Sequence, residues 1–137
     1  MKSYVLDACA VIAFILDEEG AGKVEKLLSL SSEKKCSLFI NKINLLEIYY
    51  NFRKEYDAGT LEEAYSRILG LPVTIIDFIS DDVFFEAGRL KSQYRISLAD
   101  AIALAETKIR GAMLVTADHH EFDVIDKKES IKFHWIR

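Results

Sequence analysis

The stretch that decides the fold is Tyr4-Val5-Leu6-Asp7-Ala8-Cys9-Ala10-Val11-Ile12, close to the N-terminus. Its first three residues are a short, β-prone apolar run that ends at Asp7. The residues after Asp7 are apolar on all sides and predict a buried helix over 8–16. A buried strand that passes directly into a buried helix indicates an α/β fold, with the carboxylate of Asp7 at the end of the strand.

The alternation of strand and helix continues along the whole sequence. After the strand at 4–6, the pattern predicts strands at 37–40, 73–76, 113–116 and 131–136. Helices are expected at 8–16, 20–30, 42–56, 60–69, 80–94 and 98–109. We expect Gly59 and Thr60 to interrupt the helical structure, with Thr60 capping the helix that follows. This order predicts an open, mainly parallel sheet of about five strands with helices on both faces.

Length and composition favour one globular unit. The chain has 137 residues, half of them apolar and spread along its length, so we expect a single domain over residues 1–137. The longest apolar run, 8–16, is under half of the roughly 20 residues that cross a bilayer, and the acids after it do not suit a secretion signal. Cys9 and Cys36 lack metal-ligand spacing and are interpreted as reduced thiols. These features predict a cytoplasmic protein.

The net charge limits how the protein can bind a polyanion. It is formally −4 at pH 7. A negatively charged chain does not hold nucleic acid mainly through a basic surface. If the protein acts on nucleic acid, another group must supply positive charge.

Four acidic residues fall at positions that contact with solvent does not explain. Asp7 ends the first predicted strand and Asp118 follows the fourth, so both are expected at the carboxyl edge of the sheet, where open parallel sheets bind ligands. Glu47 and Asp100 lie among apolar residues within two predicted helices. The topology is therefore expected to bring strand-end acids and helix acids together.

A cluster of carboxylates is costly unless a cation neutralises it. Two like charges about 4 Å apart repel by roughly 4 kcal/mol at an effective dielectric of about 20. Oxygen ligands with no Lys or Arg nearby suit hard cations such as Mg²⁺ or Mn²⁺. The four acids therefore predict a divalent metal site, and the bound cation would supply the missing positive charge.

Taken singly, most of these acids also have an ordinary structural interpretation. Asp7 and Asp118 fit the N-cap positions of the segments that follow them. Ser97 and Asp100 match a capping box at the start of a helix. Glu47 lies within a helix, where no capping role exists. The combination of all four is what capping does not explain.

Four segments resemble the signature blocks of PIN-domain ribonucleases, and within that family they are most similar to the VapC-type toxins of toxin-antitoxin pairs. In chain order the segments are Leu6-Asp7-Ala8-Cys9-Ala10-Val11-Ile12, Asn44-Leu45-Leu46-Glu47-Ile48, Ser97-Leu98-Ala99-Asp100-Ala101, and Thr116-Ala117-Asp118 followed by Phe122-Asp123. The resemblance covers essentially the whole chain. It implies a PIN-like three-layer α/β/α fold.

The resemblance also implies a function. It implies an endoribonuclease in which Mg²⁺ or Mn²⁺ is held chiefly by Asp7 and Asp100, with Glu47 and Asp118 completing the site. It further implies a homodimer and an antitoxin protein that occludes the site. The residues expected to support the acids, or to contact RNA near them, are Thr116, Ser97, Asp123 and Asn44.

Two further groups of residues have open interpretations. Basic residues on either side of the Asp100 segment either contact phosphates or form solvated helix faces: Arg89, Lys91, Arg95, Lys108 and Arg110. Aromatic residues of the helix at 42–56 either stack on bases or belong to the core or an interface: Tyr49, Tyr50, Phe52 and Tyr56.

Other functions compete with a metal-dependent nuclease. An aspartyl phosphatase or a receiver-like domain would use Asp7, and Asp77 after the third strand keeps the receiver possible. A catalytically silent PIN-like binding module is a third alternative. His119 and His120 invite a zinc or acid-base interpretation, but they lack a second ligand pair at metal spacing, and we interpret them as residues of a surface turn.

Overall fold

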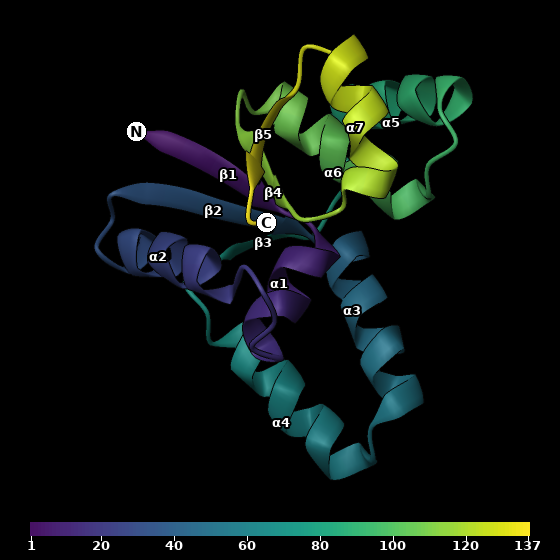
Figure 1. The fold of residues 1–137 in the computed structure, drawn as a ribbon. Coiled ribbons are helices and arrows are strands. Elements are labelled where there is room, and N and C mark those ends of the chain that lie inside the picture. Colours follow the sequence, from purple (N-terminus) through teal and green to yellow (C-terminus); the bar gives the residue numbers. More distant parts are fainter.

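Five strands form one fully parallel sheet in the computed structural model, which describes residues 1–137. They are β1 (Lys2–Leu6), β2 (Cys36–Asn41), β3 (Thr74–Ile76), β4 (Met113–Thr116) and β5 (Lys132–Trp135). Their order across the sheet is β3-β2-β1-β4-β5 (Figure 1). The prediction of an open, mainly parallel sheet is confirmed.

The order of the strands reverses beside β1, in the middle of the sheet. From β1 the chain moves outward through β2 to β3, and then returns to the other side of β1 with β4 and β5. Open parallel sheets bind ligands at the carboxyl ends of the strands that flank such a reversal. Those strands are β1, which Asp7 follows directly, and β4, which is followed by Ala117 and Asp118.

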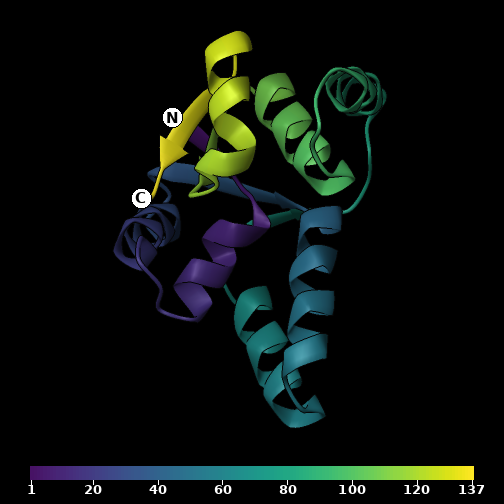
Figure 2. The ribbon, with the colours of Figure 1, turned by 45° about the vertical axis from the view of Figure 1, so that its right-hand side comes forward.

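Helices cover both faces of the sheet and complete three layers (Figures 1 and 2). On one side lie α1 (Ala8–Ile15), α2 (Ala21–Ser32), α3 (Lys42–Glu55) and α4 (Ala58–Leu69). On the other side lie α5 (Asp81–Gln93), α6 (Leu98–Ile109) and α7 (His119–Lys128). In Figure 2, α3 and α4 form an antiparallel pair that extends well beyond the sheet.

Alternating side chains of β1 divide the hydrophobic core into two parts. Tyr4 and Leu6 pack with the helices α1 to α4, whereas Val5 packs with α5, α6 and α7. Val5 and Leu6 are fully buried. Burial on both faces explains why this strand is a continuous apolar run.

The predicted start of α4 is wrong. The helix begins at Ala58, and its cap is Asp57, whose Oδ1 accepts a hydrogen bond of 2.8 Å from the Thr60 amide. Gly59 and Thr60 therefore lie inside the first turn. An Asp cap satisfies one of the free amides of that turn, which is enough to start the helix before the glycine.

The interpretation of His119 and His120 as residues of a surface turn is also wrong. They begin α7, which Asp118 caps by accepting a hydrogen bond of 3.1 Å from the Glu121 amide. The helix forms because Phe122 and Ile125, three residues apart on one face, are almost completely buried in the core.

Cys9 and Cys36 are free thiols. None of the helices has the length and apolar character needed to span a bilayer.

Candidate active site

Asp7 is a buried carboxylate at the carboxyl end of the central strand. It is 4% exposed and caps α1, with Oδ1 accepting a hydrogen bond of 2.9 Å from the Ala10 amide. Its Oδ2 accepts a hydrogen bond of 2.5 Å from the Thr116 hydroxyl. Burial raises the pKa of Asp7 to about 6, although these hydrogen bonds favour the charged form. The capping interpretation is correct for Asp7, but its second oxygen remains directed toward β4.

A cavity of about 340 Å³ opens beside Asp7, and it contains all four acids that the sequence singled out. Its lining comes from the end of β1, from α1, α3 and α6, and from the start of α7. The lining residues are Asp7, Ala8, Cys9, Ile12, Glu47, Asn51, Ser97, Asp100, Asp118 and Glu121. No Lys, Arg or His lines it. The fold thus gathers acids from distant segments into one anionic hollow.

The helix acids influence one another electrostatically. Glu47 projects from α3 and Asp100 from the first turn of α6, and both are partly buried. Burial, followed by the charges of Asp100 and Asp118, raises the pKa of Glu47. Burial also raises the pKa of Asp100, with further contributions from Asp118 and Glu121 and an opposing hydrogen bond to Ser97. Each acid therefore makes ionisation of the others less favourable.

The model of the PIN domain family matches residues 4–128, which is most of the chain. The chain belongs to the PIN domain family. The resemblance in the sequence is thereby confirmed, and the acidic hollow lies within the matched region. No curated protein matches this sequence.

Solved structures of similar fold include toxin-antitoxin proteins. VapBC2 of Rickettsia felis, bound to a DNA fragment from the promoter, is 20% identical with a TM-score of 0.78, and the match covers 97% of this chain and 98% of that one. DNA-bound VapBC of Salmonella typhimurium is 16% identical with a TM-score of 0.77 over all of both chains. VapC20 of Mycobacterium tuberculosis, described as a toxin that cleaves the sarcin-ricin loop, is 14% identical with a TM-score of 0.61, covering 80% and 85%. At these identities the likeness is one of fold.

Thr116 links two acids of this PIN domain. Its hydroxyl, which is fully buried, donates to Asp7 and also accepts a hydrogen bond of 3.1 Å from the Asp118 amide. The predicted supporting residue therefore contacts one carboxylate directly and holds the backbone that carries another.

The other predicted supporting residues lie in different places. Ser97 caps α6 through the Asp100 amide at 3.0 Å and also lines the cavity. Asn44 is buried outside the cavity and donates to the Ala99 carbonyl oxygen at 3.1 Å. Asp123 is exposed, lies outside the lining and contacts His119 at 2.8 Å.

Two polar residues of the cavity were missed from the sequence. Asn51 lies one helical turn after Glu47, and Glu121 lies three residues after Asp118. Both spacings place side chains on the same face of a helix. The spacing of Asn51 was visible in the sequence, whereas that of Glu121 carries meaning only once α7 is recognised.

Cys9 also lines the cavity, and its thiol contacts Asp7 and two residues at the end of β4, Thr116 and Ala117. Its Sγ lies 3.5 Å from both Asp7 Oδ2 and Thr116 Oγ1, and it accepts a hydrogen bond of 3.3 Å from the Ala117 amide. Burial and the charge of Asp7 raise the pKa of this thiol to about 12. Cys9 is therefore a neutral thiol at neutral pH.

The basic residues near Asp100 are mostly paired away from the hollow. Arg89 and Lys108 pair with Glu86, and Arg89 also pairs with Glu129. Arg110 lies 3.7 Å from Glu106. These pairs support the interpretation of the basic residues as helix-face residues.

The residue that kept a receiver-like domain possible lies elsewhere. Asp77 follows the edge strand β3, is exposed, and lines a different hollow from Asp7. The paired acids that a receiver domain needs are thus not assembled around this residue.

The chemistry of the cavity suits a divalent cation. Its charged donors are all carboxylates, the ligands that Mg²⁺ and Mn²⁺ select, and no basic side chain neutralises them. No three acid, His or Cys side chains are grouped closely enough here to hold one metal ion between them. The acids line the wall of a hollow, and Asp7, Glu47, Asp100 and Asp118 are the side chains that would hold a cation there.

Proposed function

We propose that this PIN domain is a divalent-metal-dependent endoribonuclease and that it acts as the toxin of a toxin-antitoxin pair. The observation that carries the proposal is the convergence of Asp7, Glu47, Asp100 and Asp118 on one cavity that has no basic residue in its lining. Family membership and the VapC-like fold support the nuclease activity. The RNA substrate is supported by the neighbour described as cleaving the sarcin-ricin loop.

In this proposal Mg²⁺ or Mn²⁺ is held chiefly by Asp7 and Asp100, with Glu47 and Asp118 completing the anionic wall. When bound, the cation supplies a water of lowered pKa and a positive charge for the phosphate oxygens. The acids act as ligands and not as nucleophiles.

The residues around the acids have distinct tasks. The Thr116 hydroxyl and the Ala10 amide fix both oxygens of Asp7, so that carboxylate cannot rotate freely. Ser97 holds the first turn of α6, which carries Asp100. Cys9 stays protonated because of its raised pKa, so it does not compete as an anionic ligand.

The proposed partners are an antitoxin protein and a second copy of the chain. The solved neighbours include a toxin-antitoxin complex from Klebsiella pneumoniae. A second copy is supported by an apolar hollow of about 640 Å³ along α5, rimmed by large exposed side chains. Those that are more than half exposed are Phe84, Phe85 and Leu98. Exposed aromatic clusters of this kind commonly mark protein interfaces.

Cleavage of labelled RNA tests the proposed activity. The wild-type protein should cut RNA with Mg²⁺ or Mn²⁺ and lose activity in EDTA. Asp7→Asn and Asp100→Asn should each reduce the rate by at least about a hundredfold, because both remove a proposed ligand. Asp126→Asn is the matched control, since Asp126 is an exposed acid outside the cavity, and it should retain activity.

Several results would contradict this assignment. Activity that persists in EDTA, or that survives both ligand substitutions, would exclude a metal-carboxylate mechanism. A phosphoenzyme trapped on Asp7 would instead favour a phosphatase. Absence of any RNA cleavage by the intact protein would favour a silent binding module. For the toxin role, expression in a bacterial host should arrest growth, and Asp100→Asn should relieve the arrest.

A further inference from the structure

Three aromatic rings form a continuous stack along the edge strand β5. Phe133 and Trp135 are stacked with ring centroids 5.1 Å apart and an angle of 9° between the planes. His119, the first residue of α7, stacks on Trp135 with centroids 3.8 Å apart and an angle of 11°. Phe122, fully buried in the core, contacts the inner end of the stack through Phe133 at 5.8 Å. The stack is therefore anchored in the core and ends at His119.

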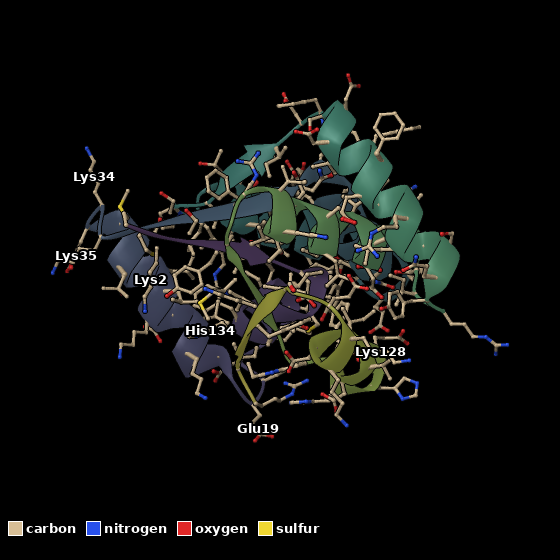
Figure 3. The ribbon with its side chains drawn as sticks, turned by 90° about the horizontal axis from the view of Figure 1, so that it is seen from above. Lys2, Glu19, Lys34, Lys35, Lys128 and His134 are labelled. Atoms are coloured by element: carbon tan, nitrogen blue, oxygen red, sulfur yellow. The ribbon has the colours of Figure 1, made fainter.

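The neighbouring residue of β5 does not belong to this stack. His134 points to the opposite face of the sheet, where it meets Tyr4 edge-on at 5.4 Å and lies next to α2 (Figure 3). Phe133 and Trp135 thus share one face because they are two residues apart on a strand.

The ring of His119 is fixed in position. Its Nδ1 lies 2.8 Å from Asp123, and its Nε2 lies 2.8 Å from the main-chain oxygen of Arg137. The Arg137 side chain is itself held, because it donates a hydrogen bond of 2.6 Å to the carbonyl oxygen of Glu19. Glu19, labelled in Figure 3, lies in the loop before α2.

One face of the His119 ring remains open. Trp135 covers the other face and both ring nitrogens have partners, yet 48% of the side chain is exposed. The exposed part must include the ring face opposite Trp135. A flat, rigid and open aromatic face is a surface on which a nucleobase can stack without ordering a flexible side chain first.

The residue that carries the open face is next in the chain to a residue of the acidic cavity. His119 directly follows Asp118, which lines the cavity. Both residues lie at the carboxyl edge of the sheet, past the ends of β4 and β5. A strand of nucleic acid that passes over this edge with a phosphate at the acids would bring an adjacent base to His119.

We propose that the open face of His119, backed by Trp135, is a stacking subsite for one base of single-stranded RNA next to the cleaved bond. The proposal rests on the ribonuclease function above. The four acids of that function are proposed as metal ligands, and His119 is the residue proposed to bind a base. The aromatic side chains of α3 are less suitable for stacking, because Phe52 is buried, Tyr49 packs edge-on against Tyr65, and Lys54 lies over the ring of Tyr50.

Binding without cleavage tests the subsite. The protein would be titrated, in Ca²⁺ in place of Mg²⁺, with a single-stranded oligoadenylate and with an abasic oligomer of equal length and charge. Fluorescence of Trp135, the only tryptophan, reports binding at the stack. His119→Ala should weaken oligoadenylate binding by about tenfold and leave the abasic oligomer unaffected, whereas His119→Phe should bind nearly as wild type. His120→Ala, which changes the adjacent exposed histidine, is the control and should bind unchanged.

Each outcome decides the matter. Equal binding of both oligomers by the wild type, or an equal loss for both in His119→Ala, would overturn the stacking subsite. Absence of any binding by the wild type would overturn it as well. RNA cleavage measured separately, in Mg²⁺, shows whether the ribonuclease function also fails, because unchanged cleavage with normal binding in His119→Ala refutes only the subsite.

Discussion

The Nδ2 group of Asn41 donates a hydrogen bond to Oε2 of Glu106 over 3.1 Å, and this bond ties the start of α3 to the C-terminal half of α6. Both residues are buried, at 1% and 3% exposure. A second bond between the same helices runs from Asn44 to the carbonyl oxygen of Ala99. Because α3 carries Glu47 and α6 carries Asp100, these bonds hold together two helices whose acids repel each other.

Asn41→Asp is expected to destabilise the protein. The new carboxylate can still cap α3, as Asn41 does through the Ile43 amide at 2.9 Å, but it faces Glu106 without a donor. The free energy of unfolding should fall by about 2 kcal/mol or more, measured by urea denaturation.

The double substitution Asn41→Asp with Glu106→Gln restores a donor and acceptor in the reverse order. It should recover most of the stability lost in the single variant. If Asn41→Asp alone is as stable as the wild type, the bond between α3 and α6 contributes nothing.

Thr116→Val should raise the pKa of Asp7 further. The Thr116 hydroxyl donates to the ionised carboxylate and so favours the charged form; its loss removes that preference. A carboxyl NMR titration of the metal-free protein measures the change. Thr116→Ser keeps the hydroxyl and should titrate close to the wild type, and a pKa equal in all three proteins would show that the hydrogen bond has no effect.

Asp7→Asn should stabilise the metal-free protein at neutral pH. Burial raises the pKa of Asp7 from 3.8 to about 6, so the folded state binds more protons than the unfolded state between these values. Stability therefore falls as the pH rises through this window and stays low above it. At pH 7 the free energy of unfolding of the Asn variant should exceed that of the wild type by about 1–3 kcal/mol.

Most of the difference should be lost at about pH 4, where the wild-type carboxyl is largely protonated in the folded state. Urea denaturation in EDTA at the two pH values measures it. If the wild type is the more stable protein at neutral pH, the ionised carboxylate of Asp7 does not destabilise the metal-free protein.

Phe85→Glu should prevent dimerisation. Phe85 is 71% exposed beside the apolar hollow of α5, and a charge there would have to be desolvated in an interface. Light scattering after size-exclusion chromatography measures the mass. Val124→Glu, at an exposed apolar position of α7, is the control and should remain a dimer. A dimer that persists in Phe85→Glu would place the interface elsewhere.

The strand-end acids were predictable from the sequence because parallel strands align their carboxyl ends at one edge. Asp7 and Asp118 follow strands that the apolar pattern marks clearly, and the structure brings both to one hollow. Glu47 and Asp100 were recognised as unusual because apolar neighbours surround them. Their proximity depends on how α3 packs against α6, and local sequence patterns do not determine that packing.

Other features depend on contacts between distant segments. The bond between Asn41 and Glu106 spans 65 residues, and neither residue carries a local signal of it. The stack of His119 on Trp135 joins the start of a helix to an edge strand. In this region the short α7 was missed because two histidines obscured the apolar positions Phe122 and Ile125.

Mn²⁺ binding measured by titration calorimetry tests the central claim most directly, because it reports on the acidic cavity without any RNA. The wild type and Asp126→Asn should bind Mn²⁺ with equal affinity. Asp100→Asn should bind it at least about tenfold more weakly, since it removes a proposed ligand while Ser97 can still cap α6. Equal binding by all three proteins, or no binding by the folded wild type, would contradict the assignment of this cavity as a metal site.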